Sequence, residues 1–132
     1  MPNIKILVVD DEKVILLAFK AVLEKEGYYV KIATNGNTAV EILRSEPFDI
    51  IYTDLIMPGM NGIELIEEIK SISQNTKVAL ITGFSLEFLK DKPAMLKACE
   101  NYKVLKKPIN NSDILELTKE LSKRETGEKL PK

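Results

Sequence analysis

The segment FDIIYTD (residues 48–54) continues into LIMPGMNG (residues 55–62), and this stretch decides the fold. Its first half is a run of mostly apolar and aromatic side chains that ends in a carboxylate. Such runs, bounded by turn signals, are typical of strands buried on both faces of a parallel sheet. The Pro58–Gly62 segment predicts a loop. Asp54 is therefore expected at the carboxyl end of a central strand, where open α/β sheets bind their ligands.

A second apolar strand ends in the same way, because Ile4–Val9 runs into Asp10, Asp11 and Glu12. An acid that begins a loop often does no more than hydrogen-bond its own backbone, and this interpretation suits Asp54 taken alone. Two parallel strands that both end in acids, however, gather negative charge at one edge of the sheet. Such a cluster is costly unless a cation compensates it.

The composition is that of an ordinary globular domain, with 132 residues and a formal net charge of −1. No strongly basic stripe is present, so contact with nucleic acid is not expected. The single Cys99 excludes an internal disulfide and a cysteine zinc site, and it is expected to be a small buried hydrophobic residue. Histidine is absent, which excludes histidine triads and histidine metal ligands. Without a signal peptide or a bilayer-spanning run, a cytoplasmic protein that does not contact membranes is expected.

Hydrophobic periodicity and turn residues predict five strands that alternate with helices. The expected strands cover residues 4–9, 28–33, 48–53, 77–81 and 102–105. This alternation predicts an α/β protein with a parallel sheet, right-handed crossovers and helices on both faces. Residues 1–123 are expected to form one domain, and residues 124–132 a disordered C-terminal tail.

The sequence indicates some helices more clearly than others. The first should end at Gly27, and its predicted buried stripe consists of Val14, Leu17, Ala18, Ala21 and Val22. Before the fifth strand, a first turn near Ser85–Leu89 should precede a helix that begins at Pro93. Asn111 or Ser112 is expected to cap the last helix.

The predicted strand ends bring acids, a hydroxyl and an amine to one edge of the sheet: Asp10, Asp11, Asp54, Thr82 and Lys107. Hard oxygen ligands of this kind suit Mg²⁺. A metal ion, a lysine and a hydroxyl can together neutralise phosphoryl oxygens during transfer, and an aspartate can itself be the nucleophile. The residues therefore predict Mg²⁺-dependent phosphoryl chemistry on a carboxylate, and they leave open which aspartate is the acceptor.

These residues resemble the motifs of a known family, the CheY-like receiver domain of response regulators in two-component signalling. The matching pieces occur in the family's order: VVDDE at 8–12, DLIMP at 54–58 with Gly62, then Thr82-Gly83 and Lys107-Pro108. The resemblance covers residues 3–123 and makes that domain a receiver domain. It implies a doubly wound (βα)5 fold with a five-stranded parallel sheet in the order 2-1-3-4-5.

The resemblance implies roles for the acids. Asp54 would accept a phosphoryl group from a histidine kinase or a histidine phosphotransfer protein. Asp11 and Asp54 would bind Mg²⁺ with the backbone carbonyl of Ile56, and Asp10 would act mainly through water. Beyond Mg²⁺-dependent phosphorylation and dephosphorylation at Asp54, no enzyme activity is expected. Glu12 is either part of the site or simply an acid at the start of a helix.

The resemblance also implies that Thr82 hydrogen-bonds a phosphoryl oxygen and that Lys107 pairs with the phosphoryl group, with a cis Lys107–Pro108 bond. Lys107 is preferred to Lys106 because it directly precedes the proline, and neighbours on a strand point to opposite sides. Thr82 would change conformation together with the side chain at position 104, where the family usually has tyrosine or phenylalanine and this chain has Val104.

The family's commonest output surface is formed by the fourth helix, the fifth strand and the fifth helix. A phosphorylation-dependent dimer through this surface is expected. The chain itself offers no second domain after residue 123, so the output is expected to be a downstream protein partner or an effector domain outside this sequence.

Three other functions compete with this interpretation. A receiver-shaped module could bind partners without phosphorylation. A phosphohydrolase of the haloacid dehalogenase-like family would need an acid two residues after its nucleophile, where this chain has Ile56. A nucleotide- or flavin-binding domain would need a glycine-rich loop after the first strand, where acids stand instead.

Overall fold

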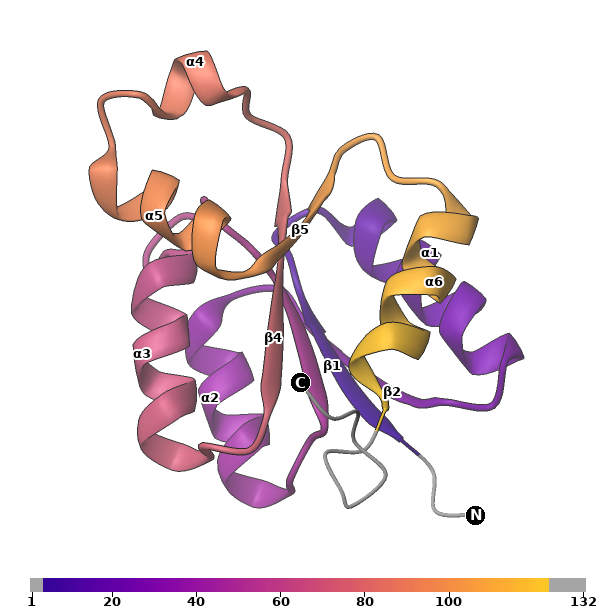
Figure 1. The fold of residues 1–132 in the computed structure, drawn as a ribbon. Helices are drawn as coiled ribbons and strands as arrows, with labels where there is room; N and C mark the ends of the chain where they lie inside the picture. Colours follow the sequence, from indigo (N-terminus) through magenta and orange to yellow (C-terminus); the bar gives the residue numbers. More distant parts are fainter. Residues whose placement is uncertain (1–3, 124–132) are drawn as a thin grey trace, which may run out of the picture.

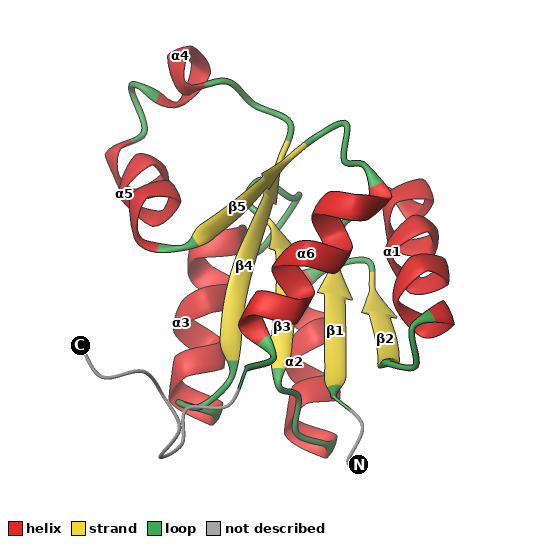
Figure 2. Ribbon diagram, turned by 45° about the vertical axis from the view of Figure 1, so that its right-hand side comes forward, coloured by secondary structure: helices red, strands yellow, loops and turns green. Residues whose placement is uncertain are grey.

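A computed structural model describes residues 4–123, and these form a single five-stranded parallel sheet with the order β2-β1-β3-β4-β5 (Figures 1 and 2). The strands are β1 (Lys5–Val9), β2 (Tyr29–Ala33), β3 (Ile50–Asp54), β4 (Lys77–Thr82) and β5 (Lys103–Lys106). The predicted fold class and strand order are confirmed. The third strand begins later than predicted and includes Asp54, which pairs with Ile81 of β4. The expected tail at 124–132 lies outside the described residues.

Helices cover both faces of the sheet. On one face lie α1 (Lys13–Lys25) and α6 (Asn111–Leu121). The other face is covered by α2 (Gly36–Ser45), α3 (Gly62–Ile72) and α5 (Pro93–Asn101). A single turn, α4 (Leu86–Leu89), stands beyond the carboxyl ends of the strands, at the top of Figure 1. Between 4 and 123, no helix has the length and apolar character needed to cross a membrane.

The core lies in two layers, because successive side chains of a strand point to opposite faces. In β1, Ile6 and Val8 pack toward α1 and α6, whereas Leu7 and Val9 pack toward α2, α3 and α5. All four side chains are fully buried. Burial on both faces explains why the central strands β1, β3 and β4 are nearly continuous apolar runs, whereas the edge strands β2 and β5 carry exposed lysines.

The buried face of α1 differs from the predicted one. Its core residues are Leu16, Phe19 and Leu23, with Val22 partly buried beside them. The remaining residues of the predicted stripe are exposed: Val14 (78%), Leu17 (58%), Ala18 and Ala21. The observed stripe follows the same helical spacing with larger side chains, and burying more apolar area stabilises the fold more.

The helix boundaries mostly agree with the prediction. Gly27 follows the end of α1 with a positive φ of 95°, and α4 and α5 divide the segment before β5 as expected. The cap of α6 was predicted wrongly: Asn110, not Asn111 or Ser112, accepts the hydrogen bond from the Asp113 N–H. Cys99 is half-buried against the core, so it is less enclosed than predicted.

Tyr52 and Thr118 form a hydrogen bond inside the core, with their hydroxyl oxygens 2.6 Å apart. Tyr52→Phe should lower the free energy of unfolding by about 1 kcal/mol, because Thr118 loses a buried partner. The double variant Tyr52→Phe/Thr118→Val removes both polar groups and should recover most of that loss. Urea denaturation of Tyr52→Phe, of Thr118→Val and of the double variant measures the three changes. A double variant whose loss of stability exceeds the sum of the two single losses would contradict the assignment.

Candidate functional site

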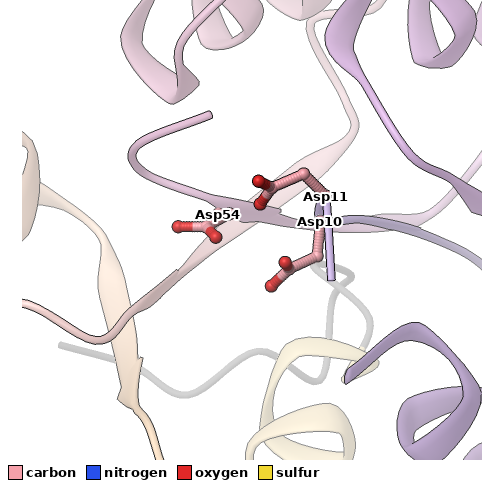
Figure 3. A group of neighbouring side chains, drawn as sticks. All are labelled: Asp10, Asp11 and Asp54. Carbon is pink, nitrogen blue, oxygen red and sulfur yellow. The ribbon is translucent and has the colours of Figure 1, made fainter. Parts of the chain in front are cut away.

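Three carboxylates meet at the carboxyl edge of the sheet (Figure 3). Asp10 and Asp11 follow β1, and Asp54 ends the neighbouring strand β3. One oxygen from each of these acids lies within 4.8 Å of the others. Asp11 is exposed, whereas Asp10 and Asp54 retain only 0% and 4% of their accessible surface. The predicted gathering of acids from two strand ends is therefore present in the structure.

The loop after Asp54 depends on glycine. The Gly62 N–H donates to the carbonyl of Leu55 over 2.9 Å, which folds the loop back on the end of β3. A Cβ atom on Gly62 would stand 2.6 Å from the Asp54 carbonyl oxygen, closer than any side chain allows. Gly59, which follows Pro58, has a positive φ of 77° that favours glycine. These two positions explain why β3 is followed by a glycine-containing turn.

Lys107 reaches the acids from the loop between β5 and α6. Its Nζ atom lies 3.1 Å from Asp54 Oδ2, 3.1 Å from Asp10 Oδ2 and 3.0 Å from Glu12 Oε1. The Lys107–Pro108 bond is cis, as expected. Lys106 is exposed, and within residues 4–123 no ion pair joins it to an acid.

Burial makes the charge on Asp10 unfavourable. Desolvation, opposed by the Glu12 N–H and reinforced by the charge of Asp54, raises the pKa of Asp10 from 3.8 to about 6. Burial alone would lower the pKa of Lys107, but its contacts with the carboxylates of Glu12, Asp10 and Asp54 raise that pKa above its ordinary value. At neutral pH the Lys107 side chain is therefore a positively charged ammonium in contact with these acids.

One oxygen of Asp10 is left without a hydrogen bond. Asp10 Oδ2 is buried and lies 3.1 Å from the Lys107 ammonium, with which it forms an ion pair but no hydrogen bond. An unsatisfied buried carboxylate oxygen is costly. Together with the all-oxygen donor set of the three aspartates, it fits the preference of Mg²⁺ for hard ligands.

The other predicted residues lie near this edge. Ile56 donates its N–H to Asp54 Oδ1 over 3.2 Å. Thr82, at the end of β4, is buried, and its Oγ1 accepts a hydrogen bond from the Phe84 N–H over 3.1 Å. Val104 of β5 is half-buried and packs on the α2, α3 and α5 side of the sheet. Glu12, whose role the sequence leaves open, accepts a hydrogen bond from the Lys107 ammonium through its carboxylate.

The chain matches the family model described as the response regulator receiver domain over residues 6–119. The chain belongs to this family. CpdR, a response regulator receiver protein of Brucella abortus, is 36% identical over 111 residues, which are 84% of this chain and 90% of CpdR.

Solved receiver domains share the fold. A CheY-like receiver domain protein from Methanospirillum hungatei is 32% identical, with a TM-score of 0.79 over 90% of this chain and 93% of that one. The response regulator TrrA from Thermotoga maritima, solved in complex with Mg²⁺–BeF, is 31% identical, with a TM-score of 0.74 over 89% of this chain and 98% of that one. The predicted family, fold and functional class are thus confirmed: this is a receiver domain, for which the phosphoacceptor role of two-component systems fits.

Proposed function

We propose that Asp54 is the phosphoacceptor of this receiver domain. The supporting observation is its position: a buried carboxylate at the acidic edge, with the Lys107 ammonium 3.1 Å from its Oδ2. A carboxylate oxygen of Asp54 forms the bond to phosphorus, while the P–N bond of a phosphohistidine breaks and the imidazole takes up a proton. The donor histidine belongs to a kinase or phosphotransfer partner, since this sequence contains no histidine.

Asp10, Asp11 and Asp54 are the residues that would hold Mg²⁺, with the Ile56 carbonyl as an additional ligand and Asp10 acting mainly through water. Bound Mg²⁺ would offset the negative charge that builds on the phosphoryl oxygens. The complex of Thermotoga TrrA with Mg²⁺–BeF supports this assignment by similarity.

Thr82 and Lys107 are the protein's own donors to the phosphoryl group. Lys107 carries a positive charge in contact with Asp54, and it can follow the phosphoryl oxygens as charge develops there. The Thr82 hydroxyl accepts the Phe84 N–H through its oxygen, which leaves its hydrogen free to be donated.

Movement of Thr82 toward the phosphoryl group would then reach Val104 on the adjacent strand and alter the surface of α5, β5 and α6. A downstream protein, an effector domain or a second copy would recognise that surface.

The proposal is tested by intact-mass measurement after incubation with acetyl phosphate and Mg²⁺. The expected product carries one added phosphoryl group, and chelation of Mg²⁺ should prevent its formation. A chain that takes up no phosphoryl group under conditions that preserve acyl phosphates would instead support a module that binds partners without phosphorylation.

The two adjacent lysines provide a matched pair. Lys107→Ala should slow labelling by acetyl phosphate by about tenfold or more, because the transition state loses a charged donor. Lys106→Ala removes the same charge from an exposed neighbour and should leave the rate nearly unchanged. Initial rates of phosphoryl incorporation measure both, and equal losses would show that the wrong lysine is assigned.

A further inference from the structure

Glu12 directs its side chain away from its own helix and into the site. It occupies the N-cap position of α1, where a polar side chain can accept a backbone N–H, yet it makes no such bond. Its Oε1 atom accepts a hydrogen bond from the Lys107 ammonium, 3.0 Å away and 95 positions along the chain. Its backbone N–H donates to Asp10 Oδ1 over 2.8 Å. Glu12 thus connects the loop after β1 to the loop after β5.

The Lys107 ammonium contacts acids of two kinds. Asp10 and Asp54 belong to the group whose oxygens can share a metal ion, and Glu12 lies outside that group. A divalent cation on Asp10 and Asp54 would compete with Lys107 for their oxygens and repel the ammonium. Glu12, with a side chain that is 60% exposed at the rim, is the acid that remains for Lys107 to contact.

We propose, building on the assignment of Asp54 as phosphoacceptor, that Glu12 is a positioning residue for Lys107. Its carboxylate holds the ammonium at the rim of the site while Asp10 and Asp54 bind a divalent cation. The contact keeps Lys107 within reach of Asp54 without occupying the metal ligands. When Glu12 is neutralised, the Lys107 ammonium contacts only Asp10 and Asp54. It then competes more strongly with the cation for the oxygens of these two acids.

A double-mutant cycle on Mg²⁺ binding by the full chain, measured by calorimetry without a phosphodonor, tests this role. Glu12→Gln should raise the dissociation constant for Mg²⁺ about two- to fivefold, the size of an exposed ion pair. In the Lys107→Ala background the same substitution should change the constant by less than about 1.5-fold, because Glu12 acts through Lys107.

The control is Glu24→Gln, which neutralises an acid paired with Lys20 on the same helix and should leave the constant unchanged. Equal changes in both backgrounds would overturn the proposal, because Glu12 would then act as a plain charge or a metal ligand. No change in either background would overturn it as well.

A metal-free measurement separates this proposal from the assignment of Asp54. In the NMR spectrum of the lysine side chains, Glu12→Gln should shift the Lys107 ammonium signal and leave that of Lys106 in place. An unmoved Lys107 signal would overturn the role of Glu12 even if Asp54 is phosphorylated normally. If the wild-type chain is not phosphorylated but Glu12→Gln still shifts the Lys107 signal, only the assignment of Asp54 as acceptor is contradicted.

Discussion

Asp54→Asn should abolish phosphoryl incorporation from acetyl phosphate and Mg²⁺. The amide nitrogen and oxygen of asparagine are poor nucleophiles, and the substitution also removes a charge that Lys107 contacts and that Mg²⁺ would contact when bound. The size and packing of the side chain are retained, so the fold should persist. Intact mass should show no added phosphoryl group in the variant under conditions that label the wild-type chain.

Asp49→Asn is the matched control for this substitution. Asp49 directly precedes β3, at the end of the strand opposite Asp54, and accepts a hydrogen bond from the Lys5 N–H. The Asp49→Asn variant should take up a phosphoryl group like the wild-type chain. Labelling of Asp54→Asn at the wild-type level would mean that another residue carries the phosphoryl group.

Asp10→Asn should stabilise the metal-free fold above about pH 6. The pKa of Asp10 is raised from 3.8 to about 6, so the folded chain keeps a proton that the unfolded chain has already lost between these values. Stability therefore falls as pH rises through this window, and the full penalty is present above it. A shift of this size corresponds to about 2–3 kcal/mol, which the neutral amide should largely recover at pH 7.5.

Urea denaturation at pH 4 and pH 7.5 measures the effect, which should be small at the lower pH. Asp11→Asn is the comparison, because Asp11 carries the same charge in the same cluster but is exposed. It should change the metal-free stability by less than about 0.5 kcal/mol. Added Mg²⁺ should stabilise the wild-type chain most, since a ligand of the folded state adds stability according to its affinity. A destabilised Asp10→Asn variant at pH 7.5 would contradict this account.

The sheet could be predicted because its three central strands, β1, β3 and β4, are nearly continuous apolar runs that end next to an acid or a glycine. The buried face of α1 could not be predicted in this way. Its sequence is apolar on most sides, so Leu16 and Leu17 offer alternative stripes, and packing against the sheet and α6 chooses between them. Periodicity alone carries no information on that choice.

The acids of the site could be predicted from the topology, because parallel strands bring their carboxyl ends to one edge. The contact between Glu12 and Lys107 could not, because it joins residues 95 positions apart through two long side chains. The hydrogen bond from the Phe84 N–H to the Thr82 hydroxyl could not be predicted either. Such contacts depend on side-chain conformations that the order of residues does not specify.

The assignment of Asp54 as acceptor is tested by locating the phosphoryl group after labelling with acetyl phosphate and Mg²⁺. Borohydride reduces an aspartyl phosphate to homoserine, and peptide mass spectrometry then identifies the position. Homoserine is expected at position 54 and at no other aspartate. Homoserine at position 10 or 11, or a phosphoryl group that borohydride does not convert, would contradict this assignment.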